Sequence, residues 1–182
     1  MKKLLLAITM MVGLVAGFSL TSCGGGGGGD NEIAYFTGKT FSFENLSTGS
    51  MRLSVGAAIG GDGKAAHGTL TFENGLNTPA TIRLTKIGKD AEGNMVSCNL
   101  LLYGLKAEVI SHPTVLAYFN MSSRNDGDIN ITNSVSIMIE LETLPQGMNS
   151  APYSAVVGGV EWDDDGGDAG EWTAAGMMYR TH

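Results

Sequence analysis

The chain has 182 residues, 43% of them hydrophobic, and its 18 acidic against 11 basic side chains give a formal net charge of −7 at pH 7. This length suits one domain with a sizeable core. The acidic balance argues against nucleic acid and anionic membrane surfaces as partners of the folded part, because both are negatively charged.

The N-terminus combines a short basic start, an apolar run and a cysteine. Lys2 and Lys3 precede the apolar residues 4–18, and Leu20-Thr21-Ser22-Cys23 follows them. The run is short for a membrane span and has the layout of a secretory signal. This segment resembles the signal peptide and lipobox of a bacterial lipoprotein precursor, in which a Leu-small-small-Cys box ends the apolar segment.

The resemblance implies that residues 1–22 are a signal peptide and that Cys23 becomes the first residue of the mature chain. In that family the cysteine carries a diacylglycerol and an acylated amine, and several acyl chains together anchor a protein far better than one. We therefore expect a cell-envelope protein whose membrane partner is reached through the lipid on Cys23. In the Gram-negative sorting rule, Asp after the cysteine retains the protein in the inner membrane. Gly24 stands there instead, so we expect the outer membrane. An ordinary signal peptide with a chance cysteine is the alternative.

Six consecutive glycines, Gly24 to Gly29, follow the cysteine. Glycine has no side chain to bury and loses the most backbone entropy on ordering. Residues 23–31 are therefore predicted to be a flexible tether with a root-mean-square reach of about 12–15 Å. Residues 32–182 remain as a single β domain.

Apolar and polar residues alternate over 40–44, 52–57, 69–73, 81–85 and 135–142, which predicts half-buried antiparallel strands. Further strands are expected over 95–103, 114–122, 154–162 and 171–180, with Gly, Asn, Asp and Pro turn signals between them. Residues 105–109 can form one helical turn, which Pro113 would end. The alternation predicts these inward-facing residues: Phe41, Phe43, Leu53, Val55, Ala57, Leu70, Phe72, Ile82, Leu84, Val135, Ile137, Ile139 and Leu141.

About nine strands and no amphipathic helix indicate an all-β fold. Short local connections favour an antiparallel meander that closes into a barrel, and a two-sheet β-sandwich is the alternative. The segment Thr40-Phe41-Ser42-Phe43-Glu44-Asn45 is echoed by Thr69-Leu70-Thr71-Phe72-Glu73-Asn74. The repeat is similar to uncharacterised lipocalin-like β-meander lipoproteins of bacteria. The Gly-x-Trp signature of lipocalins is missing, since Gly38-Lys39-Thr40 stands in its place.

The two cysteines have different expected roles. If Cys23 carries lipid, Cys98 has no partner for a disulfide within the chain. Cys98 alternates with Val96 and Leu100, so we expect it to point inward as a small apolar residue.

The densest group of acidic residues lies between positions 161 and 172. Asp163, Asp165 and Asp168 stand in a glycine-rich loop that can supply several of the six to eight oxygens that calcium takes. The spacing is not that of an EF-hand. The alternative is a solvated hairpin tip that needs no cation, so the expected cofactor is either none or calcium.

Trp162 and Trp172 flank this acidic loop in two Glu-Trp pairs. They are expected to face each other across a hairpin, as aromatic pairs do in sheets. The functional alternative is a ligand-binding platform, because aromatic faces stack on sugars and the neighbouring acids accept hydrogen bonds from hydroxyls.

No catalytic motif occurs: the chain has no Gly-x-Ser-x-Gly elbow, no Walker loop and no His-Glu-x-x-His pair. We therefore expect a non-enzymatic binding module for a small apolar or glycan ligand. The alternative is a structural lipoprotein that docks to another envelope component. A large apolar pocket lined by convergent polar groups would favour the first function. A filled interior with an exposed apolar patch or an unpaired edge strand would favour the second.

Overall fold

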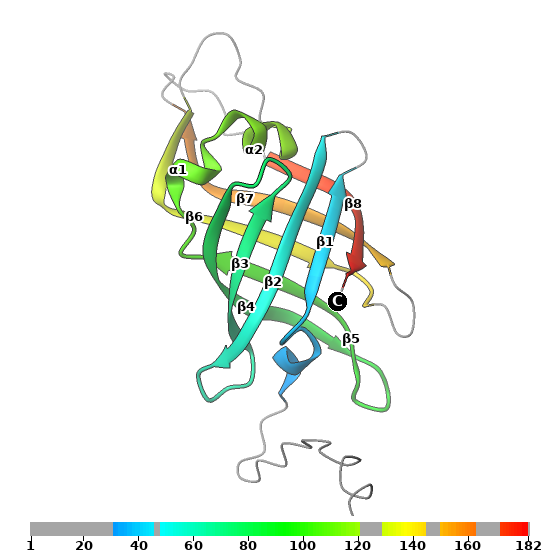
Figure 1. Ribbon diagram of the computed structural model, residues 1–182. Coiled ribbons are helices and arrows are strands. Elements are labelled where there is room, and N and C mark those ends of the chain that lie inside the picture. Colours follow the sequence, from blue (N-terminus) through cyan, green and yellow to red (C-terminus); the bar gives the residue numbers. More distant parts are fainter. Residues whose placement is uncertain (1–30, 46–47, 121–128, 145–149, 163–171, 182) are drawn as a thin grey trace, which may run out of the picture.

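Eight antiparallel strands form one closed barrel in the computed structural model, which describes residues 31–45, 48–120, 129–144, 150–162 and 172–181 (Figure 1). Each strand pairs with its neighbours in sequence, and β1 pairs with β8 to close the barrel. The expected all-β meander barrel is thus confirmed in place of the two-sheet sandwich. The strands are β1 (Thr40–Asn45), β2 (Gly49–Ile59), β3 (Ala65–Phe72), β4 (Asn77–Lys89), β5 (Met95–Tyr103), β6 (Ile129–Leu141), β7 (Ser150–Trp162) and β8 (Trp172–Arg180).

Short helices lie at the two ends of the barrel (Figure 1). The 3₁₀-helix η1 (Glu32–Tyr35) precedes β1 at one end, and α1 (Ala107–Ile110) and α2 (Pro113–Tyr118) lie over the other. We call these the η1 end and the helix end. Within the described ranges, none of the helices is long and apolar enough to cross a membrane.

The predicted inward-facing residues fill the barrel, with one exception. Twelve of the thirteen are no more than 4% exposed. Ala57 is exposed instead, because the register of β2 against β3 shifts between Val55 and Ala58. Two residues of β2 there oppose one residue of β3, and the alternation of buried and exposed positions stops at this bulge, where Gly56, Ala57 and Ala58 are all exposed.

The internal repeat places equivalent side chains on either side of β2. Phe41 of β1 and Leu70 of β3 both lie opposite Leu53. One step along, Phe43 and Phe72 both lie opposite Met51. The two copies of the repeat therefore place equivalent apolar side chains on the two strands that flank β2 in the core.

The strand expected over 114–122 is wrong, because residues 113–118 form α2. Pro113 occupies the first turn of α2, where its missing N–H costs nothing, so it begins a helix and does not end one. The Nδ1 atom of His112 accepts a hydrogen bond from the backbone N–H of Thr114 at 3.3 Å and caps the helix. Val115 and Tyr118 are buried at the i, i+3 spacing of a helical face. The helical turn expected near 105–109 is confirmed as α1.

Cys98 is 1% exposed and is a free thiol, as its alternation with apolar neighbours predicts. Burial raises its pKa to about 12. A buried, protonated thiol is a poor nucleophile.

Cys98 should make the protein less stable at alkaline pH. The unfolded thiol ionises near its ordinary pKa of 9.0, whereas the folded thiol keeps its proton until about 12. Between these values the folded state binds more protons, so the free energy of unfolding should fall by about 1.4 kcal/mol per pH unit from this group. Urea unfolding from pH 8 to 11, in a Cys23→Ala background, should show a shallower decline for Cys98→Ala. Equal slopes for the two proteins would contradict the prediction.

Candidate functional site

The three-residue period of η1 gives this short helix two distinct faces. Side chains three apart are eclipsed on a 3₁₀-helix. Ile33 and the capping residue Phe36 share one face and are completely buried, so they close the barrel at this end. Glu32 and Tyr35 share the next face. The backbone N–H of Ile33 donates to the carbonyl of Gly63 at 2.9 Å and anchors η1 to the β2–β3 turn.

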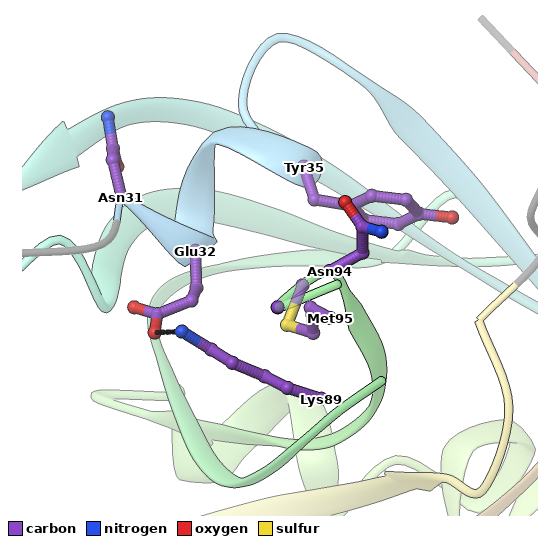
Figure 2. Close-up of a pocket in the computed structure, with 7 residues that line it drawn as sticks. Asn31, Glu32, Tyr35, Lys89, Asn94 and Met95 are labelled. Atoms are coloured by element: carbon purple, nitrogen blue, oxygen red, sulfur yellow. Dashed lines mark ion pairs between the residues drawn. The ribbon is translucent and has the colours of Figure 1, made fainter. Parts of the chain in front are cut away.

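A groove lies between the Glu32 and Tyr35 face and the β4–β5 hairpin (Figure 2). Its volume is about 340 Å³, which is at the lower end of the range for small-molecule sites. We call it the η1 groove. It is lined by Asn31, Glu32, Tyr35, Lys89, Gly93, Asn94 and Met95.

Glu32 is the central charged group of the η1 groove. Figure 2 shows its side chain meeting that of Lys89 from across the groove, with 3.1 Å between Oε1 and Nζ. The Glu32 side chain is 9% exposed and that of Lys89 is 32% exposed. Among the described residues, the second oxygen of Glu32, Oε2, has no hydrogen-bond partner although it is buried. A buried carboxylate oxygen without a donor is costly, so Glu32 keeps the capacity to accept one more hydrogen bond.

The hairpin that faces Glu32 has an irregular backbone. The register of β4 against β5 shifts between Thr85 and Gly88 and again between Gly88 and Lys89. Lys86 has a φ of 47°, which a residue with a side chain adopts at a cost in strain. Bulges redirect the side chains that follow them. Here the irregular segment ends on Lys89, the partner of Glu32.

Asp90 holds the turn of the same hairpin. Its carboxylate accepts hydrogen bonds from the backbone N–H of Asn94 at 2.7 Å and from the Asn94 side-chain amide at 3.1 Å. The bond from that side chain holds the pKa of Asp90 below its ordinary value. Because the NH₂ group of Asn94 donates to Asp90, the orientation of the amide at the groove is defined.

Tyr35 supplies the aromatic ring of the η1 groove. The Nζ of Lys39 donates to the carbonyl of Tyr35 and lies 4.6 Å from the centre of its ring. The ring also meets Phe36 edge to face, with 4.8 Å between centroids. Burial raises the pKa of Tyr35, so its hydroxyl is protonated at neutral pH. The ring is therefore held in place by a cation and a second aromatic group.

A second groove lies on the outer wall of the barrel, over β2, β3 and the turn after β3. Its volume is about 360 Å³, and it is lined by Ser50, Arg52, Thr71, Phe72, Glu73 and Gly75. The carboxylate of Glu73 there accepts a hydrogen bond from the backbone N–H of Ser50 at 3.3 Å. The acid of this second groove thus already has a donor, unlike the buried oxygen of Glu32.

Most of the site residues expected from the sequence lie outside the described residues. This applies to Cys23 and to Asp163, Asp165 and Asp168. In the part of the chain that the structure does describe, no three His, Cys, Asp or Glu residues gather as metal ligands.

The two tryptophans expected to form a pair stand at strand ends. Trp162 ends β7 and lies opposite Ile129 of β6, whereas Trp172 begins β8 and lies opposite Val157. The backbone register thus does not place them opposite each other. Both stand at the helix end, where the Asn120 side chain donates to the carbonyl of Thr173 at 2.8 Å. The barrel therefore separates them from the η1 groove.

The residues of the η1 groove were missed by reasoning from the sequence. They come from 31–35 and 89–95, which no local pattern connects. One signal was present: the alternation of β4 breaks down after Thr85, as expected for a bulge. A comparison of the chain with protein-family models, curated proteins and solved structures finds no match.

Proposed function

We propose that the protein is a lipid-anchored, non-enzymatic binding module of the cell envelope and that its ligand binds in the η1 groove. The observation that carries this proposal is the buried Glu32 carboxylate, which lines a groove and has one oxygen that no described residue donates to. A folded protein tolerates such a group only at a cost in stability, and a ligand that donates a hydrogen bond there would remove that cost.

The packing of the barrel favours the η1 groove over the barrel interior as the place where a ligand binds. An eight-stranded barrel is just wide enough to be filled by side chains or to hold one small ligand. Here Ile33 and Phe36 close the η1 end, Tyr118 and Phe119 are buried under the helix end, and residues such as Leu100 between them are fully buried. A small apolar ligand in the barrel mouth therefore has less support than a polar ligand at the surface.

The alternative function, docking to another envelope component, also has less support. The closed barrel leaves no strand of the described sheet unpaired. Tyr103, at 40% exposure, is the one large hydrophobic side chain among the described residues that is exposed. Stable docking surfaces usually offer a larger apolar patch.

The tether determines where the η1 groove would operate. Residues 23–31 would span about 30 Å at most when fully extended. A lipid on Cys23 would therefore keep the η1 end, where Asn31 lines the groove, close to the membrane surface. We propose the outer membrane as the location, on the basis of Gly24 after the cysteine.

Anchoring is tested by labelling with radioactive palmitate. The label should enter the mature wild-type protein, and Cys23→Ala should take up none. Cys98→Ala is the matched control and should behave like wild type. Equal labelling of wild type and Cys23→Ala would refute the anchor.

The position of the site is tested by NMR on the mature Cys23→Ala protein. Separate additions of saccharides, polyamines and fatty acids should shift the resonances of groove residues such as Asn94. Shifts confined to barrel residues such as Ile137, or to the tryptophan indoles, would place the site elsewhere.

A further inference from the structure

The groups that line the η1 groove are those that recognise a hydroxylated ring. Glu32 accepts hydrogen bonds, Lys89 donates them, and the amides of Asn31 and Asn94 do both. Tyr35 offers an aromatic ring and Met95 an apolar thioether. A sugar ring matches this mixture, because it carries hydroxyls around its edge and an apolar face of C–H groups.

From this lining we infer that the η1 groove binds a neutral saccharide. The inference rests on the proposed function and narrows its ligand. The buried oxygen of Glu32 would accept a hydroxyl of the sugar, and the ring of Tyr35 would pack against the apolar face. Hydrogen bonds to a charged acceptor are about twice as strong as neutral ones, so Glu32 should contribute the most to affinity.

The charges of the groove favour a neutral ligand over an ionic one. Glu32 and Lys89 already neutralise each other at 3.1 Å. A cationic ligand would compete with Lys89 for the carboxylate, and an anionic ligand would have to approach Glu32. Separating a largely buried ion pair leaves one charge without compensation, which is strongly unfavourable. A hydroxyl supplies the missing donor and leaves the ion pair intact.

The buried oxygen requires a small movement on binding. Oε2 of Glu32 is shielded from solvent. The terminal torsion of a glutamate side chain is soft, so the carboxylate can turn toward a ligand while it stays near Lys89. A volume of about 340 Å³ suits one or two sugar rings.

The ligand class is tested by NMR titration of the mature Cys23→Ala protein with defined sugars. Maltose and N,N′-diacetylchitobiose are the neutral probes, and glucosamine and glucuronate are the cationic and anionic ones. The neutral disaccharides should shift the Asn94 resonances with dissociation constants in the millimolar range or below. The charged sugars should bind at least fivefold more weakly.

Two substitutions test the roles of the groove residues. Glu32→Gln should weaken binding of the better disaccharide about tenfold, which corresponds to one charged hydrogen bond. Tyr35→Leu should weaken it through loss of the ring. Glu73→Gln is the matched control, since Glu73 lines a groove of similar volume on the barrel wall. The Glu73→Gln variant should bind the disaccharide with the affinity of the wild-type protein. Thermal unfolding of each variant verifies that it is folded.

The source of the sugar is distinguished by a vesicle experiment. The mature Cys23→Ala protein should sediment with phosphatidylcholine vesicles that contain digalactosyl diacylglycerol if the sugar is a lipid headgroup. If only the free disaccharide binds, the ligand is a soluble glycan.

The inference is wrong if neither form of neutral sugar shifts the groove resonances at 20 mM. If a polyamine or a fatty acid shifts those resonances instead, the saccharide is refuted while the binding function stands. If no probe shifts them, both proposals fail.

Discussion

Gly176→Ala should lower the free energy of unfolding by about 3 kcal/mol, at the upper end of the range for overpacked sites. Gly176 lies opposite Asn45 where β8 meets β1, and this pairing closes the barrel. A Cβ atom added at Gly176 would stand 1.8 Å from the carbonyl oxygen of Glu44 and 2.9 Å from its carbon. Both atoms belong to the backbone, so no side chain can move aside and β1 itself must shift. Urea unfolding followed by circular dichroism measures the loss.

Gly61→Ala is the matched control for this prediction. An added Cβ at Gly61 would meet no atom within 4 Å, and its φ is not in the left-handed region. Its stability should stay within about 0.5 kcal/mol of wild type, as for most surface substitutions. An equal unfolding midpoint for Gly176→Ala and Gly61→Ala would show that the seam between β1 and β8 is not closely packed. A weakened seam should also promote aggregation, because it exposes two unpaired strand edges.

Tyr118→Ala should cost about 3–5 kcal/mol, the usual range for removal of a buried aromatic side chain. Tyr118 joins the helix end to the barrel interior. Its hydroxyl donates to the carbonyl of Phe43 at 3.0 Å and lies 2.5 Å from the hydroxyl of Tyr153. Its ring meets Phe72 and Phe119 edge to face. Loss of the side chain removes the hydroxyl contacts and the ring contacts and leaves a cavity beneath α2.

Two further variants separate the contributions of Tyr118. Tyr118→Phe keeps the ring and removes the hydroxyl, so the carbonyl of Phe43 loses its donor from Tyr118 at a cost of about 1–3 kcal/mol. Tyr103→Ala makes the same deletion at a residue that is 40% exposed and should change stability by less than 1 kcal/mol.

Urea unfolding measures the free energy of unfolding of each variant and ranks them. The dye 1-anilinonaphthalene-8-sulfonate should fluoresce more strongly with Tyr118→Ala than with wild type. The interpretation fails if Tyr118→Ala is as stable as Tyr103→Ala.

The helix end and the η1 end have different roles under the proposed function. At the helix end the backbone carbonyl of Tyr118 accepts hydrogen bonds from the side chains of Asn45 and Thr48, which tie α2 to the ends of β1 and β2. This end is a packed closure. At the η1 end the surface carries a strained hairpin and the Glu32 carboxylate, one oxygen of which has no donor in the described part of the chain. Features of that kind cluster at binding sites, which is why we place the ligand there.

Local alternation was sufficient to predict the class of fold. Residues such as Phe41 and Phe43, or Ile137 and Ile139, face the core because side chains on a strand alternate between its two faces, and this rule needs no distant partner. Short turns rich in glycine and asparagine predicted the order of the strands, since neighbours joined by such turns pair with each other. The same rule failed at 113–118, where a proline at the first position and a capping histidine select a helix.

The sequence by itself therefore determined the strands, their meander order and the burial of most of their apolar residues, because these depend on contacts between near neighbours. Only the tertiary structure decided the closure of β1 on β8, the close approach at Gly176 and the meeting of Glu32 with Lys89. Each of these joins residues far apart in the chain, and their distances depend on the curvature of the whole barrel and on bulges that no local pattern specifies. The η1 groove consequently exists only once the barrel has closed beneath η1.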